Sequence, residues 1–454
     1  MPFRAKSLIT AFVLGLTSAA ATVAVGTGPA LAGAQLLIEA DSGRVLHAEN
    51  ATYPWYPASL TKLMTLYVTL HAVKEGRIKT DSLITVTPSA VAQAPAKMGF
   101  KNGTQLTVDN AIKMLMVKSA NDMAVTLAEG VSGSIENFAD EMNRSAQRLG
   151  MTQTSYVNPN GLPADGQISS ARDIGILARA LIREFPEYDF YWHIPAMKFG
   201  KRVTRNYNPL LGRYPGADGM KTGYICASGF NMVVSATRNG KRLIAVVLGA
   251  PSSAVRAMRA AQLLERGFNS GGLSWLTSSL GTVNALTPID AAPPNLRDEM
   301  CGPHRRRPAV EEDAAEVASN GDSEPPVLLS SLRAPNGKPF SLTGPPLYAV
   351  QPVEVFIGPP KKSAGSQIAS AAAALGNAVK LVKPIAAKPG QIAPALVTSG
   401  PAPVAAPGAV PWTSFTPTAL ANAPPSELTA TLAETSVPLP RPRPRLAISQ
   451  PRKR

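Results

Sequence analysis

Short runs with strand character lie at both ends of the first 270 residues, and segments with helical periodicity separate them. The five runs are residues 34–40, 44–48, 219–224, 230–237 and 243–248. Asp41-Ser-Gly43 separates the first two, which predicts a β-hairpin. Asn239-Gly240 separates the last two and is a strong signal for a tight hairpin turn. Strands grouped around a helical middle favour an α+β fold with an antiparallel sheet over a repeated βαβ fold.

The middle of the chain carries apolar residues at helical spacing. The predicted helices cover residues 59–68, 111–116, 123–127 and 138–149. Ser170-Ala-Arg-Asp173 has the form of a capping box and predicts a further helix that runs to about Arg183. Residues 252–267 return to helical spacing after the last strand. The pattern therefore predicts an antiparallel sheet flanked by helices, with a mainly helical part between its strands.

The distribution of proline limits the compact domain to the first part of the chain. Of the 42 prolines in 454 residues, 29 lie in residues 281–454. Proline lacks the backbone N–H and disrupts helix interiors and central strands. We therefore expect a folded domain over residues 33–270 and a Pro/Ala-rich, mostly disordered tail over 271–454, with a small ordered piece around 327–357.

The first 32 residues have the pattern of a signal peptide. Arg4 and Lys6 precede an apolar stretch, residues 8–25, and Ala30-x-Ala32 has the small residues that signal peptidase accepts. An uncleaved membrane anchor is the alternative, since 18 apolar residues nearly suffice to span a bilayer. The Ala, Thr and Gly content favours cleavage after Ala32. We therefore expect an exported protein of the periplasm or another extracytoplasmic part of the cell envelope.

Composition excludes several classes of function. The net charge is +15, but it is spread thinly and aromatic residues make up only 6%, so a nucleic-acid surface is not indicated. Two cysteines cannot form a disulfide-dense scaffold or a four-cysteine zinc site. The four histidines are scattered, and their spacing is not that of metal ligands. We expect neither a metal nor another cofactor.

Three short motifs carry the candidate chemistry: Ser59-x-x-Lys62, Ser119-Ala-Asn121 and Lys221-Thr222-Gly223. Each alone is weak, because a helix cap, a loop or a strand end produces the same letters. Together they agree in order, spacing and structural context. Ser59 and Lys62 share one face of a helix start, and a serine needs a neighbouring base to become a nucleophile. A partly desolvated lysine can supply that base without histidine.

The other two motifs supply the remaining parts of a hydrolytic site. Ser119 can relay a proton and Asn121 can hold a substrate amide. Lys221 at a strand edge places a positive charge for a substrate carboxylate, and the strand backbone offers a donor for an oxyanion.

This set of motifs resembles that of the penicillin-recognising serine enzymes. Residues 34–270, about half of the chain, resemble more closely the low-molecular-mass penicillin-binding D-alanyl-D-alanine carboxypeptidases, peptidase family S11. The resemblance rests on the stretches around the three motifs, on Ala227-Ser-Gly-Phe-Asn231, and on Gly249-Ala250 followed by Arg256. It implies a β-lactamase/transpeptidase-like fold. It also implies that Ser59 is the acyl-enzyme nucleophile, Lys62 the general base and Ser119 the proton relay. The substrate-binding residues implied by the resemblance are Asn121, Lys221, Thr222 and Gly223, with assistance from Arg256. The implied oxyanion hole consists of the backbone N–H groups of Ser59 and Tyr224.

The function implied by the resemblance is a serine-type carboxypeptidase that trims the terminal D-Ala of peptidoglycan pentapeptides. The implied partners are stem peptides that end in D-Ala-D-Ala and β-lactam antibiotics that acylate the serine. Endopeptidase action on peptidoglycan cross-links and a catalytically weak wall-binding protein remain alternatives. A β-lactamase would need a deacylating carboxylate, for which the sequence offers no match.

The chain departs from the family pattern in three places. Ile225 stands where many members have Thr, and Cys226 lies almost in the site. The sequence leaves open whether Cys226 and Cys301 pair. The tail does not resemble the family's usual β-rich second domain with its amphipathic anchoring helix. Its last 14 residues carry six positive charges, interspersed with prolines. That basic end could make electrostatic contact with an anionic wall polymer or membrane.

Overall fold

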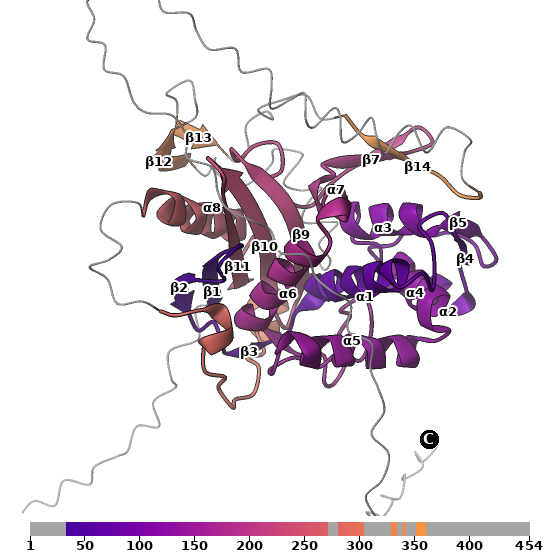
Figure 1. Cartoon of the computed structure of the whole chain (residues 1–454), viewed down its shortest axis with the longest axis horizontal. Coiled ribbons are helices and arrows are strands. Elements are labelled where there is room, and N and C mark those ends of the chain that lie inside the picture. The colour runs from indigo at the N-terminus through magenta and orange to yellow at the C-terminus, as the bar shows by residue number, and fades with distance from the viewer. Residues whose placement is uncertain (1–32, 271–279, 304–327, 334–338, 342–350, 360–454) are drawn as a thin grey trace, which may run out of the picture. The chain divides into compact units, whose positions relative to one another are not determined.

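The computed structural model describes residues 33–270, 280–303, 328–333, 339–341 and 351–359, which are built around a five-stranded antiparallel sheet (Figure 1). The sheet has the strand order β2-β1-β11-β10-β9. Its strands are β1 (Ala34–Glu39), β2 (Val45–Glu49), β9 (Ala217–Ile225), β10 (Gly229–Arg238) and β11 (Lys241–Ala250). The predicted signal segment, residues 1–32, and the basic end lie outside the described residues.

Successive residues of the sheet face two different cores. In β11, Ile244 and Val246 belong to the core shared with the helical lobe, whereas Ala245 and Val247 belong to the core beneath α8 (Ser253–Asn269). The helix α6 (Ala171–Glu184) packs on the first of these faces. Because both faces of β11 are covered, its sequence is an almost continuous apolar run rather than an alternating one.

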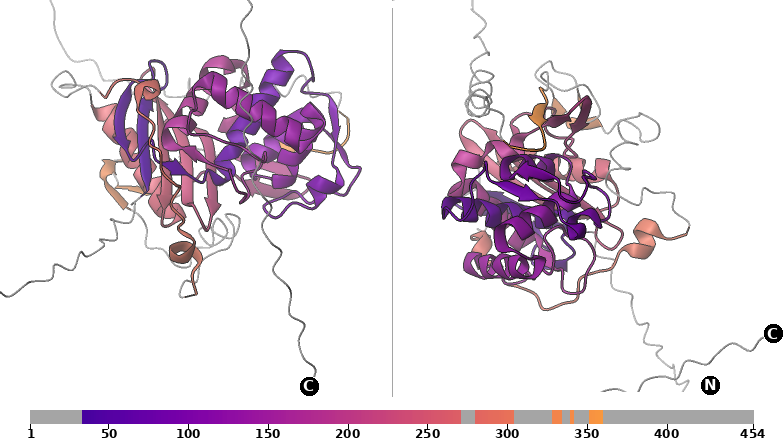
Figure 2. Two further views of the ribbon diagram at one scale, coloured as in Figure 1. Left: turned by 90° about the horizontal axis from the view of Figure 1, so that it is seen from below. Right: turned by 90° about the vertical axis from the view of Figure 1, so that its right-hand side faces the viewer.

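A helical lobe lies beyond the β9 edge of the sheet, as Figure 1 and the left view of Figure 2 show. Its central helix, α1 (Lys62–Lys74), is buried along ten of its thirteen residues. A helix that is apolar all round belongs in the middle of a bundle, and α1 packs against α3, α4, α5 and α6. The remaining helices of the lobe are α2 (Pro88–Val91), α3 (Val108–Val117), α4 (Asn121–Ser132), α5 (Ile135–Leu149) and α7 (Phe190–His193).

Short elements make up the rest of the described structure. The 3₁₀ helices are η1 (Ala58–Thr61), η2 (Pro186–Tyr188) and η4 (Val283–Ala285). The short strands form four small sheets: β3 (Pro54–Trp55) with β6 (Ser169–Ser170), β4 (Leu83–Thr85) with β5 (Gln105–Thr107), β7 (Ala196–Phe199) with β8 (Arg202–Arg205) and β14 (Val353–Val355), and β12 (Leu328–Arg333) with β13 (Pro339–Ser341).

The predicted α+β arrangement is confirmed, and its local signals act as expected. Asn239 and Gly240 have φ values of 50° and 76°, the left-handed conformations that a tight hairpin turn requires. Ser170 caps α6 by accepting a hydrogen bond from the backbone N of Asp173 at 3.1 Å. Asp173 does not complete the capping box, because its carboxylate bonds Arg172, Gln153 and Thr154 instead.

Two segments beyond residue 270 pack against the domain. Val283, Leu296 and Met300 are buried in the core, and the short helix α9 (Arg297–Cys301) follows Leu296 directly. The strand β14 pairs in parallel with β7. The expected boundary at residue 270 therefore leaves out chain that contributes to the packed core. Among the described residues, no helix combines the length and apolar character needed to cross a membrane.

Candidate active site

Ser59 lies on the 3₁₀ turn η1, directly before α1 begins at Lys62. Because a 3₁₀ helix has three residues per turn, residues i and i+3 lie above one another. The Lys62 Nζ accordingly stands 2.8 Å from the Ser59 Oγ. Ala58, before the serine, has φ +49°, a conformation uncommon for a residue with a side chain and one that concentrates at functional sites. The serine and the lysine predicted to act together are thus in hydrogen-bond contact.

The Lys62 amine is fully buried and surrounded by oxygen atoms. It donates to the Asn121 Oδ1 at 2.7 Å and to the backbone O of Asn160 at 2.6 Å. Together with the Ser59 Oγ, these two acceptors receive three hydrogen bonds from the Lys62 Nζ. The contacts hold the amine in one place beside the Ser59 hydroxyl.

Asn121 is held from both ends of its amide. Its Nδ2 donates to the backbone O of Ala94 at 2.9 Å, while its Oδ1 accepts from Lys62. The side chain thus orients the lysine, and one amide N–H and one oxygen lone pair remain for a substrate. The neighbouring Asp122 accepts from the backbone N–H groups of Met98 and Gly99 and fixes the adjoining loop.

A second lysine–serine pair faces the first. The Lys221 Nζ donates to the Ser119 Oγ at 2.8 Å and to the backbone O of Thr222 at 2.9 Å. Ser119 has φ +58° in the bend between α3 and α4. The Thr222 Oγ1 is buried and has no hydrogen-bond partner among the described residues. Buried hydroxyls are normally paired, so a bound acceptor such as a carboxylate could satisfy this one.

Gly223 allows β9 to approach the nucleophile closely. A Cβ at this position would stand 2.9 Å from the Ser59 N and 3.2 Å from the Leu60 N. Since β9 is an edge strand of the sheet, backbone groups on its open side are available to an extended ligand. The next residue, Tyr224, stacks its ring on Phe230 at 4.2 Å, within the core beneath α8.

Arg256 braces this region through the backbone. It is 1% exposed, and its Nη1 donates to the O of Asn231 at 3.1 Å and to the O of Gly223 at 3.4 Å. Its guanidinium also lies 5.6 Å from the centre of the Phe230 ring. These contacts hold the guanidinium behind β9; its assistance in substrate binding stays a prediction.

The structure joins the two cysteines whose pairing the sequence left open. Cys226 and Cys301 form a disulfide with Cα atoms 5.7 Å apart. The backbone N of Leu296 donates to the O of Ala227 at 3.0 Å, so the start of α9 is held against the end of β9. The motifs did not indicate the hydrogen bond between Leu296 and Ala227 or the one from Lys62 to the carbonyl of Asn160. Both bonds use backbone atoms, which do not depend on the type of side chain.

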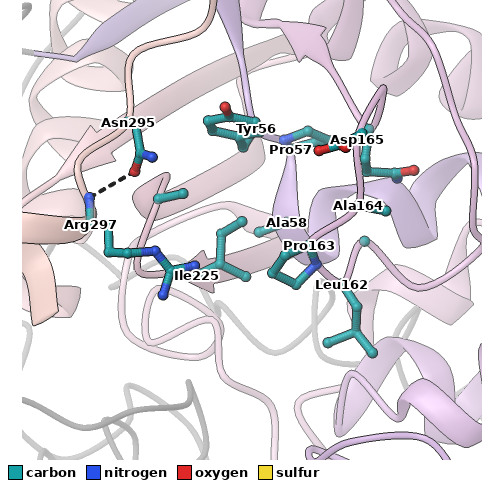
Figure 3. Close-up of a pocket in the computed structure, with 13 residues that line it drawn as sticks. Tyr56, Pro57, Ala58, Leu162, Pro163, Ala164, Asp165, Ile225, Asn295 and Arg297 are labelled. Carbon is teal, nitrogen blue, oxygen red and sulfur yellow. Dashed lines mark hydrogen bonds between the residues drawn. The ribbon is translucent and has the colours of Figure 1, made fainter. Parts of the chain in front are cut away.

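A pocket of about 240 Å³ adjoins the serine (Figure 3). Its walls come from four segments: residues 56–58 before Ser59, the loop 161–167, residues 225 and 227 after the Lys-Thr-Gly motif, and residues 295 and 297 at the start of α9. The pocket therefore continues the site along the direction in which β9 runs.

Comparison with known proteins agrees with this geometry. The family model for D-alanyl-D-alanine carboxypeptidases, peptidase S11, matches residues 21–252. The chain is 39% identical over 264 residues to the D-alanyl-D-alanine carboxypeptidase DacC of Escherichia coli, which covers 57% of this chain and 66% of the relative. It is 38% identical over 238 residues to DacA of Haemophilus influenzae, which covers 51% of this chain and 61% of the relative. The chain thus spans less than two thirds of the length of these curated relatives.

Solved structures show the same fold. Penicillin binding protein 5 from Haemophilus influenzae superposes with a TM-score of 0.51 and 38% identity, over 53% of this chain and 71% of that one. The D-alanyl-D-alanine carboxypeptidase DacD from Francisella tularensis gives a TM-score of 0.51 and 30% identity, over 52% of this chain and 70% of that one. The similarity is confined to about half of the present chain.

Proposed function

We propose, from the premise that the chain belongs to the S11 family of D-alanyl-D-alanine carboxypeptidases, that it removes the C-terminal D-alanine from peptidoglycan stem peptides through an acyl-enzyme. The observation that carries the proposal is the 2.8 Å contact between the Lys62 Nζ and the Ser59 Oγ. A hydroxyl with a desolvated amine at this distance is an activated nucleophile.

In the first step, the Ser59 Oγ attacks the carbonyl carbon of the penultimate D-Ala and its proton passes to the Lys62 Nζ. The N–H groups of Ser59 and Tyr224 would stabilise the oxyanion, since Gly223 brings β9 against the Ser59 N. The C–N bond then breaks, and the proton that Lys62 accepted passes through the Ser119 hydroxyl to the departing amine, which returns Lys62 to its neutral form. The Lys221 Nζ holds the Ser119 Oγ in position for this relay. Lys62 activates the water that hydrolyses the resulting ester.

The terminal carboxylate of the substrate would lie at Lys221 and Thr222. Lys221 supplies the positive charge, and the unpartnered Thr222 hydroxyl supplies a hydrogen-bond donor. Asn121 would hold the substrate amide with its remaining N–H. A β-lactam carries a carboxylate near a strained amide, so it would acylate Ser59 by the same route.

We also propose that the protein acts outside the cytoplasm after cleavage at Ala32. The Cys226–Cys301 disulfide supports this, because disulfides persist in oxidising compartments. The basic end of the chain would add loose electrostatic attraction to an anionic wall polymer or membrane. Co-sedimentation with sacculi or anionic vesicles, with and without residues 437–454 and at two salt concentrations, tests that contact.

The central test is mass spectrometry of the mature protein after benzylpenicillin, together with an assay for D-alanine release from a D-Ala-D-Ala peptide. We expect one penicilloyl adduct on the peptide that contains Ser59, and Ser59→Ala should abolish both the adduct and D-alanine release. Ser42→Ala, which removes an exposed hydroxyl in the turn between β1 and β2, serves as the matched control. An adduct that persists in Ser59→Ala would overturn the mechanism.

A further inference from the structure

The pocket beside Ser59 presents one positive and one negative side chain that no described residue neutralises. Arg297 and Asp165 both line it and both are exposed. Within the described part of the chain, neither side chain forms an ion pair. Figure 3 shows the Arg297 side chain extending toward Ile225 and Pro163, whereas Asp165 is drawn on the other side of the pocket, beyond Pro57.

The direction of β9 fixes which part of a substrate reaches this pocket. Under the proposed function, the terminal carboxylate lies at Lys221 and the scissile carbonyl lies opposite the Ser59 N, next to Gly223. A strand advances about 3.3 Å per residue, so chain preceding the scissile bond extends past Ile225 toward α9. The residue that precedes D-Ala-D-Ala therefore places its side chain at the pocket.

The position of Arg297 is set by three contacts of its own segment. Its backbone N donates to the Asn295 Oδ1 at 3.0 Å, and the preceding residue, Leu296, is buried and bonds the O of Ala227. The disulfide from Cys301 ties the other end of α9 to Cys226. The guanidinium thus stands on a fixed backbone beside the site, although it comes from chain beyond residue 270.

We propose that this pocket recognises a zwitterionic side chain on the residue before D-Ala-D-Ala, one that ends in both a carboxylate and an ammonium group. Arg297 pairs with the carboxylate and Asp165 with the ammonium. The inference rests on the proposed function and adds to it the class of stem peptide. A guanidinium binds a carboxylate through two parallel hydrogen bonds, so an amide in place of the carboxylate loses the charge and one acceptor.

The test compares four peptides of the form X-D-Ala-D-Ala: X is diaminopimelate, the same residue with its side-chain carboxylate amidated, lysine, or lysine acetylated on its side chain. We expect the parent to release D-alanine from the diaminopimelyl peptide with a kcat/KM about tenfold above that for the amidated one. Arg297→Gln should lower only the first value, to the level of the amidated peptide. Asp165→Asn should lower kcat/KM for the lysyl peptide but not for its side-chain-acetylated form. Arg202→Gln, an exposed arginine on β8 outside the pocket, should change none of these.

Equal rates for the diaminopimelyl and amidated peptides in the parent would overturn the inference, as would an equal loss on both in Arg297→Gln. Calorimetric binding of the same peptides to Ser59→Ala separates this result from failure of the proposed function. If no peptide releases D-alanine, yet Ser59→Ala binds the diaminopimelyl peptide more tightly and loses that preference with Arg297→Gln, the pocket stands and the activity does not. If Ser59→Ala shows no preference, the pocket assignment is wrong.

Discussion

Removing the Cys226–Cys301 disulfide tests whether the chain beyond residue 270 is part of the folded domain. The change is the double substitution of both cysteines by alanine, which leaves no free thiol. The bond joins residues 75 apart in sequence. A closed loop of that length lowers the entropy of the unfolded chain enough to contribute about 4.5 kcal/mol to the free energy of unfolding at 25 °C.

We expect the double variant to lose about 3–4 kcal/mol of this contribution, because the buried side chains of Leu296 and Met300 still hold the segment in the folded state. For a domain of this size, such a loss lowers the melting temperature by roughly 8–15 °C. Urea unfolding of the full mature chain, followed by circular dichroism, measures the free energy. Dithiothreitol should shift the parent toward the variant and leave the variant unchanged.

The acylation rate with benzylpenicillin supplies a second measurement on the same samples. The Ser59–Lys62 and Ser119–Lys221 contacts do not involve α9, so acylation should remain within about threefold of the parent at temperatures well below unfolding. A loss of stability below about 1 kcal/mol would refute the reasoning, because it would mean that α9 does not fold with the domain.

Three further predictions concern single side chains. Lys62→Ala should abolish acylation by benzylpenicillin, whereas Lys221→Ala should chiefly remove the preference for a peptide with a free C-terminal carboxylate over its amide; equal effects of both variants on the two peptides would contradict this division. Gly223→Ala should slow acylation by about 100-fold or more and also lower the melting temperature, because its methyl group would stand 2.9 Å from the Ser59 N, the oxyanion donor, and 3.2 Å from the backbone O of Pro57. Stopped-flow acylation at a temperature where the variant is folded checks this, and a parent-like rate would refute the assignment of the oxyanion hole. The hydrogen bond and charge of Arg44 lower the pKa of Glu39 from 4.5 to about 2, so the pair contributes stability that is present above pH 4.5 and is lost as the pH falls toward 2. Glu39→Gln should therefore lower the free energy of unfolding by about 1–2 kcal/mol at pH 7, a modest value because Arg44 is partly exposed. Urea titrations should show the difference in free energy of unfolding between variant and parent becoming smaller between pH 5 and 3.

Local sequence signals predicted most of the fold because each acts over a few residues. The apolar runs of β10 and β11, the Asn239-Gly240 turn and the helical run after Ser59 depend only on neighbouring positions, and the structure places each as expected. The start of the helix differs in one respect. Ser59 occupies a 3₁₀ turn rather than the α-helix itself, and this tighter turn aligns it with Lys62.

The sequence could bring the motifs together only through their resemblance to a family, because residues 59, 119 and 221 meet through tertiary packing. It could not assign the backbone carbonyl of Asn160 to Lys62, since every residue carries a carbonyl. Nor could it place α9 against β9. Few apolar residues of that segment are buried against the domain. The surrounding sequence is rich in proline, and such a composition is typical of disorder, so the segment gives no clear signal of a folded element.

The pairing of β14 with β7 has a consequence for shortened forms of the protein. In the sheet of order β14-β7-β8, β7 is the central strand, and Val353 pairs with Met197 across a long stretch of chain. A protein cut before residue 351 would retain β7 with one row of backbone N–H and C=O groups unpaired. Such a row is a template for strands from other molecules. Shortening the chain there would expose the edge of β7 on the helical lobe to strands of other molecules. The shortened protein would then self-associate, although its active-site residues would all be present.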